Sequence, residues 1–199
     1  MRFMKVLIPL LVLAMLAACA KPPQVEVDAA KVALDTAVTN PDVATYAPGA
    51  LQAAQDRLTQ LQSELDAQAA KGALSRKYDE AKNMALEAQA AAEGLAAQAA
   101  TAKEQTKADA MTMLNELAIA VPEAEKGLAQ AKRVRGVTLD FKSLTASLAQ
   151  AKTEVAAADA AYNSGDFATA KATATAVKDS LAMGQQVVAD AVAAAKVSK

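Results

Sequence analysis

The 199-residue chain has no histidine, no tryptophan and a single cysteine, and only 3% of its residues are aromatic. The missing histidine excludes Ser-His-Asp and Cys-His catalysis, imidazole metal ligands and the usual switch near neutral pH. The single cysteine excludes internal disulfides and every CxxC motif. Seven glycines and six prolines are too few for a low-complexity disordered chain. We therefore expect a folded protein that is not an enzyme and that holds no metal and no cofactor.

Alanine is what the chain has in excess. It makes up about a quarter of the residues, well above ordinary usage, and it is the strongest helix former. The 21 basic and 22 acidic residues leave a net charge of −1, with neither a basic face nor an acidic tail, so we expect no nucleic-acid partner. The composition predicts an all-α protein.

The N-terminus has the pattern of an export signal. Arg2 and Lys5 precede an apolar run from Val6 to Leu16. This run is shorter than the roughly 20 residues that a membrane-spanning helix needs, and small residues follow it. We predict that residues 1–18 are a signal peptide and not part of the fold.

The end of this segment resembles the lipobox of bacterial lipoproteins, with Leu16 and two alanines before Cys19. The resemblance implies cleavage after Ala18, thioether lipidation of Cys19 and acylation of the new amino terminus. The alternative is an ordinary signal peptide with an incidental cysteine. Residues 19–24 would form the lipidated end and a short stiff linker. The position after Cys19 is Ala20 and not aspartate. By its resemblance to the sorting pattern of enterobacterial lipoproteins, this implies the outer membrane, facing the periplasm.

Prolines, glycines and turn residues divide residues 25–199 into predicted helices. The expected ranges are about 25–39, 48–71, 76–121, 122–136, a fifth helix ending near Tyr162, and 167–197. The turn before the last helix is Asn163 to Asp166, where Asp166 is the predicted N-cap. Residues 161–170 also look like the turn of a tetratricopeptide repeat, but no 34-residue period accompanies it.

The apolar residues recur three and four positions apart, which predicts coiled-coil packing. The series Leu51 to Leu65 aligns with Phe141 to Val155 at an offset of 90, and Tyr78 to Ala88 aligns with Phe167 to Val177 at an offset of 89. This pattern indicates an internal duplication of helical hairpins at about 48–105 and 138–197. Chance similarity between Ala-rich helices is the alternative.

A turn at Val121 and Pro122 would fold the long helix back on the following ones. The result would be one elongated antiparallel bundle, residues 25–199, with up-down-up-down topology. In this arrangement Tyr78, Tyr162 and Phe167 would cap one end of the bundle.

Part of the chain resembles an uncharacterised domain family of Ala-rich helical bacterial lipoproteins. The resemblance lies in the run from Tyr46 to Leu51, in Ala54 and Leu58, and in the run from Tyr78 to Ala81 beyond a turn. It covers about residues 25–92, with a fainter echo near the C-terminus. It implies a location in the cell envelope and no established chemistry.

Few side chains are candidates for chemistry. The carboxylate pairs Asp79–Glu80 and Glu123–Glu125 fall at predicted helix starts, where acids complement the helix dipole. A basic patch, Lys132, Arg133 and Arg135, falls in a predicted last helical turn. Its functional alternative is contact with anionic headgroups or an acidic partner. The stretch from Met111 to Val121 is strongly apolar, and the sequence leaves open whether it is buried or a binding surface.

We therefore expect a lipid-anchored periplasmic protein with a structural, scaffolding or protein-interaction role. Its contacts would be the membrane through Cys19, envelope proteins or peptidoglycan, and further copies of itself. The alternative function is a carrier or accessory binder of an apolar or peptide ligand. The sequence determines neither the partner nor the oligomeric state.

Overall fold

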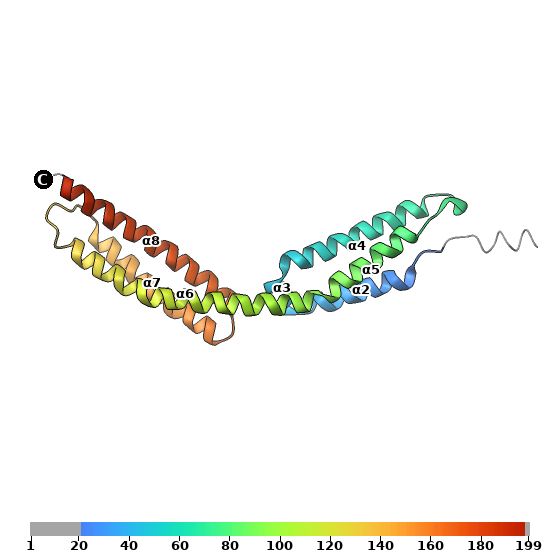
Figure 1. Ribbon diagram of the computed structural model, residues 1–199, viewed down its shortest axis with the longest axis horizontal. Helices are drawn as coiled ribbons and strands as arrows, with labels where there is room; N and C mark the ends of the chain where they lie inside the picture. Colours follow the sequence, from blue (N-terminus) through green and yellow to red (C-terminus); the bar gives the residue numbers. More distant parts are fainter. Residues whose placement is uncertain (1–20, 198–199) are drawn as a thin grey trace, which may run out of the picture. The chain divides into compact units, whose positions relative to one another are not determined.

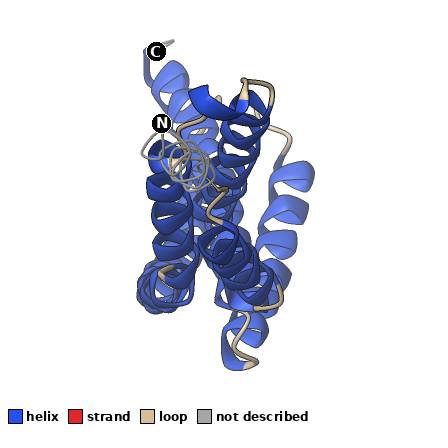
Figure 2. Cartoon of the chain, turned by 90° about the vertical axis from the view of Figure 1, so that its right-hand side faces the viewer, coloured by secondary structure: helices blue, strands red, loops and turns tan. Residues whose placement is uncertain are grey.

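The computed structural model describes residues 21–197, and Cys19 with the predicted signal peptide lies outside them. In the described part the chain is helical without strands, so the all-α prediction is confirmed (Figures 1 and 2). The chain divides between Ala100 and Thr101 into two compact units. The sequence pattern had instead favoured one bundle over residues 25–199. Each unit is described by itself below.

Unit 1 contains helices α2 (Gln24–Val38), α3 (Pro41–Tyr46), α4 (Pro48–Ala69) and α5 (Asp79–Glu93), with a short 3₁₀ turn at Ala73–Ser75. The predicted bounds of α2 and α4 agree within two residues. The short helix α3 was not predicted, although its signal is present. Pro41 occupies the first turn, and the Asn40 side chain accepts a hydrogen bond from the Asp42 N–H at 3.0 Å.

Alanine sets the spacing of the helices in unit 1. The buried face of α5 consists of Ala81, Ala85, Ala88 and Ala92. Such small side chains let the α2 and α5 backbones pack closely, and α4 also packs on α5 (Figure 1). Larger side chains close the core, and Leu61 of α4 is only 1% exposed.

The turn between α4 and α5 is held by side chains. Arg76 donates hydrogen bonds to the carbonyls of Ala69, the last residue of α4, and Lys71, two residues beyond it. The buried Gln68 side chain accepts a hydrogen bond from the Lys77 N–H at 3.0 Å. The Arg76 bonds satisfy carbonyl groups that a helix end otherwise leaves without a partner.

Helix α6 (Leu95–Ala131) begins in unit 1 and continues into unit 2, where it packs with α7 (Phe141–Asn163) and α8 (Phe167–Val197). The predicted turn at Val121 and Pro122 is wrong, because Pro122 lies inside α6. The physical reason is the buried stripe, which keeps its spacing across the proline through Leu117, Val121, Leu128 and Ala131. The antiparallel fold-back expected at this proline is therefore absent.

The other helix ends of unit 2 follow capping chemistry. Asp140 accepts a hydrogen bond from the Ser143 N–H at the start of α7, and Asp166 accepts one from the Thr169 N–H at the start of α8. The predicted cap at Asp166 is thus confirmed, and the Thr169 backbone bond lowers the pKa of this carboxyl. Gly165 before it has φ of 88°, a conformation that favours glycine.

Burial repeats between the two units at the predicted offsets. Leu61 and Ala151, 90 residues apart, are both buried. Ala81 and Ala170, 89 residues apart, are both fully buried, and the next positions along the two helices repeat this pattern. The hairpins α4–α5 and α7–α8 therefore use equivalent faces, while the duplication itself stays a prediction.

Candidate functional site

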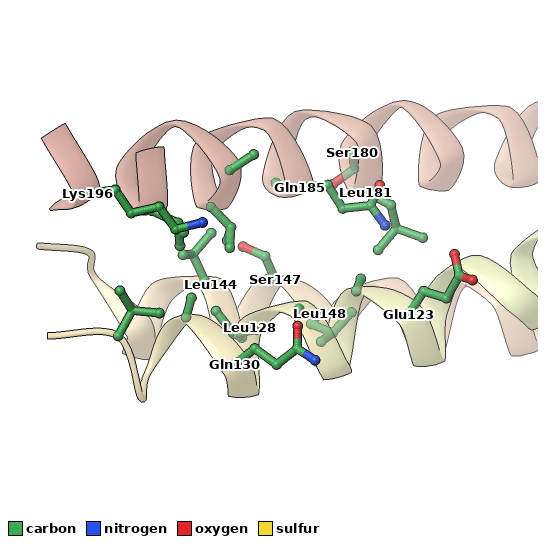
Figure 3. Close-up of a pocket in the computed structure, with 18 residues that line it drawn as sticks. Glu123, Leu128, Gln130, Leu144, Ser147, Leu148, Ser180, Leu181, Gln185 and Lys196 are labelled. Carbon is green, nitrogen blue, oxygen red and sulfur yellow. The ribbon is translucent and has the colours of Figure 1, made fainter. Parts of the chain in front are cut away.

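Unit 2 contains a cavity of about 470 Å³ between α6, α7 and α8 (Figure 3). Each of the three helices contributes aliphatic side chains to its lining. Leu128 of α6 and Leu181 of α8 are buried, whereas Leu144, Leu148 and Val188 are half-buried because they face the open space. Mostly apolar pockets of this size, with a few polar groups, are typical of sites for small ligands.

Two glycines help to make this space. Gly127 of α6 and Gly184 of α8 both line the cavity, and a Cβ built on either one would meet no atom within 4 Å. Glycine in a helix interior is less favourable than alanine. Both glycines thus lower helix stability at positions where a larger side chain would occupy part of the cavity.

Charge is separated along the cavity. Figure 3 shows Lys196 reaching from α8 into the space at one end and Glu123 of α6 at the other end. The loop after α6 adjoins the Lys196 end, because a Cβ built on Gly136 would lie 3.9 Å from the Ala195 Cβ.

That loop carries the predicted basic patch, but not in a helical turn. Because α6 ends at Ala131, Lys132, Arg133 and Arg135 all follow the helix. The Lys132 Nζ lies 5.8 Å from the centre of the Phe141 ring. Within residues 21–197, Arg133 and Arg135 form no ion pair.

Ion pairs fix α8 on α6 farther from this end. The Lys171 ammonium lies 2.7 Å from Asp109, and Lys178 lies 2.6 Å from Glu116. The hydrogen bond from Lys171, followed by one from Gln105, lowers the pKa of Asp109, while the Glu116 carboxylate raises the pKa of Lys178. In unit 1, Lys82 pairs with Glu26 at 3.1 Å, and Lys82 precedes Lys171 by the repeat offset of 89.

Unit 1 has a groove of about 670 Å³ between α2 and α5, which extends to the start of α6. Its lining is mainly alanine and polar side chains, including Asp28, Thr36 and Gln89. Val32 is the one aliphatic side chain larger than alanine in this lining, whereas leucine and valine side chains from all three helices line the cavity in unit 2. The cavity in unit 2 is therefore the better candidate site.

The two carboxylate pairs considered from the sequence occupy different kinds of position in the structure. Asp79 and Glu80 lie in the first turn of α5, as predicted. The prediction for Glu123 and Glu125 is wrong, because α6 continues through this segment and both residues lie in mid-helix. Glu125 pairs with Lys152 of α7, and Glu123 lines the cavity.

The apolar stretch from Met111 to Val121 is divided between core and surface. Leu114, Leu117 and Val121 are buried against α7 and α8, while Met111 is 47% and Ile119 is 64% exposed. Of the predicted aromatic cluster, the rings of Tyr162 and Phe167 lie 5.2 Å apart, whereas Tyr78 packs in the core of unit 1.

The cavity was not predicted from the sequence. Its one local signal is the pair of glycines inside helices, Gly127 and Gly184. The cavity also requires α7 and α8 to pack along α6 beyond Pro122. The sequence analysis did not predict this packing, because it placed a turn at that proline.

Two other kinds of site are absent from the described residues. No group of three or more histidine, cysteine, aspartate or glutamate side chains between residues 21 and 197 could hold a metal ion. None of the described helices combines the length and apolar character needed to cross a membrane.

Comparison with known proteins found no matching family model, no matching curated protein and no matching solved structure.

Proposed function

We propose that the chain is a lipoprotein of the bacterial cell envelope, anchored through Cys19 and facing the periplasm, with a structural or protein-interaction role. The observation that carries the proposal is the lipobox-like end of the basic and apolar N-terminal segment, where Cys19 is the only cysteine in the chain. Two or more acyl chains give a stable membrane anchor, whereas one chain alone is marginal.

The fold supports the structural part of this proposal. The helices of both units pack through alanine, and interhelical ion pairs such as Lys178 with Glu116 lie on the surface. Such helices present long polar faces, which suit contact with envelope proteins, peptidoglycan or a second copy of the chain.

The anchor is tested by the variant Cys19→Ser, expressed in a bacterium with lipoprotein processing. We expect the variant to lose incorporation of labelled palmitate and to move from the membrane fraction to the soluble fraction. The matched control, Ala18→Gly, keeps a small residue before the cysteine and should remain labelled and membrane-bound. A Cys19→Ser protein that loses its label but stays in the membrane would show that lipid is not the anchor.

A second function, binding of an apolar ligand, is favoured by the cavity of about 470 Å³ in unit 2. Its half-buried leucine and valine side chains leave apolar surface in contact with water, which an apolar ligand would cover. Native mass spectrometry of the full chain carrying Cys19→Ser tests this function. A co-purifying small molecule that is absent from Gly184→Leu would support it, and only unliganded protein would oppose it.

A further inference from the structure

We propose that the cavity in unit 2 binds a long-chain fatty acid, with the alkyl chain between α6, α7 and α8 and the carboxylate at Lys196. The proposal rests on the second function above, apolar-ligand binding, and specifies the ligand class.

The volume of the cavity fits one alkyl chain. A cavity of about 150 Å³ lined by apolar side chains holds one benzene molecule. The site in unit 2, at about 470 Å³, is several times larger and is roomy enough for a long alkyl chain.

The shape of the cavity favours a chain over a compact ring system. Its lining on α8 runs from Ser180 to Lys196, which is about 24 Å at the helical rise per residue. The middle of this length is mostly aliphatic, with Leu128, Leu144 and Val188 from the three helices, and Ser147 and Gln185 also line it. A peptide would bring more amide groups than these two polar side chains can pair with, and an amide buried without a hydrogen bond is costly. An alkyl chain has no such groups.

The charges select an anionic head and its direction. The Lys196 ammonium lies at one end of the cavity and the Glu123 carboxylate at the other (Figure 3). Arg133 and Arg135 lie in the loop that adjoins the Lys196 end. Asp140, the one acid in that loop, accepts the capping hydrogen bond of Ser143. A carboxylate is therefore attracted to the Lys196 end and repelled from the Glu123 end.

These cations also balance the partial negative charge at the C-terminal ends of α6 and α8. The test therefore needs a readout that depends on the charge of the ligand and not on the stability of the protein. Palmitate and hexadecanol provide it, because they share the alkyl chain and differ in the charge of the head group.

The experiment uses the full chain carrying Cys19→Ser, which removes covalent acyl groups, and measures calorimetric binding of each compound below its aggregation limit. We expect one palmitate per chain. Lys196→Ala should weaken palmitate binding by about tenfold and leave hexadecanol binding unchanged. Gly184→Leu should weaken binding of both compounds strongly, because its side chain would occupy part of the space that the alkyl chain needs. The exposed Lys31 of α2 supplies the control Lys31→Ala, which should change neither.

The outcomes separate the two levels of the proposal. Equal binding of both compounds, with no effect of Lys196→Ala, would overturn the fatty-acid assignment and keep an apolar-ligand site. Binding of both compounds that Gly184→Leu leaves unchanged would place the ligand elsewhere and overturn the assignment. Binding of neither compound would reject the apolar-ligand function as well. Circular dichroism checks that Gly184→Leu folds, and Gly127→Leu replaces it if it does not.

Discussion

At the scale of single residues, the glycines of unit 2 fall into two physical classes. Gly184 sits in the interior of α8 with open space around it, whereas Gly165 has φ of 88° in the turn before α8. The first class is destabilising because glycine loses more backbone entropy on folding than alanine does. The second is required by the backbone, since other residues are strained in the left-handed region.

This difference predicts opposite effects of the same substitution. Gly184→Ala should raise the free energy of unfolding by about 1 kcal/mol, because the added methyl group meets nothing within 4 Å. Gly165→Ala should lower it by about 1 to 2 kcal/mol. Urea unfolding followed by circular dichroism measures both. A loss of stability in Gly184→Ala would mean that the space beside it is smaller than the structure indicates.

Residue-scale prediction from sequence succeeded where the signal is local. The cap at Asp166 needs only a turn before a helix, so the sequence was sufficient to identify it. The role of Glu123 was missed, because its position at a cavity end depends on α7 and α8 packing along α6. Lys196 was not considered, because its local sequence gives no sign of the neighbouring space.

At the scale of elements, helix α6 shows how tertiary packing can override a local breaker. Proline lacks an N–H and disfavours a helix interior, so the sequence predicted a helix end at Pro122. The exposed position of Pro122 and the unbroken buried stripe on the opposite face explain why the helix continues. The bounds of α2, α4 and α8 were predictable within two residues. The helix predicted over 76–121 is instead divided at Gly94 into α5 and α6, and α6 ends at Ala131 and not near Gly136.

Pro122 should therefore be a weak point that substitution can repair. Pro122→Ala restores the hydrogen bond to the carbonyl of Ala118, which is exposed, and should stabilise unit 2 by about 1 to 3 kcal/mol. The control is Pro48→Ala in the first turn of α4. A backbone N–H at this position has no partner within the helix, so replacing the proline should lower the free energy of unfolding by about 0.5 to 1 kcal/mol. Hydrogen exchange of α6 gives the local readout. Equal or faster exchange in Pro122→Ala would show that the proline does not destabilise α6.

At the scale of the whole molecule, the sequence indicated two related hairpins but not the division of the chain into two units. The hairpins repeat a pattern of buried positions that periodicity reveals. The division depends on where the cores end, and no composition shift marks the boundary between Ala100 and Thr101, because α6 runs through it.

Each unit builds its core from its own residues, and this predicts independent responses to damage. Leu61 and Leu117 are each 1% exposed, and they belong to separate buried clusters in units 1 and 2. Leu61→Ala and Leu117→Ala should each cost about 2 to 5 kcal/mol, because each leaves a cavity in a packed core. Leu61→Ala should speed hydrogen exchange in α2, α4 and α5, and Leu117→Ala should speed it in α7 and α8.

The double variant provides the decisive comparison, because substitutions without shared partners usually add within about 0.5 kcal/mol. Hydrogen exchange of peptides from each helix, measured by mass spectrometry, gives the local opening free energy. It is measured in the wild type, the two single variants and the double variant. If the cores are separate, Leu61→Ala should not change the exchange of the α8 peptides. This should hold both in the wild-type background and in the Leu117→Ala background. If Leu61→Ala speeds exchange in α8 as much as in α5, the two units open together, since damage to one core then reaches the other through the α6 helix they share.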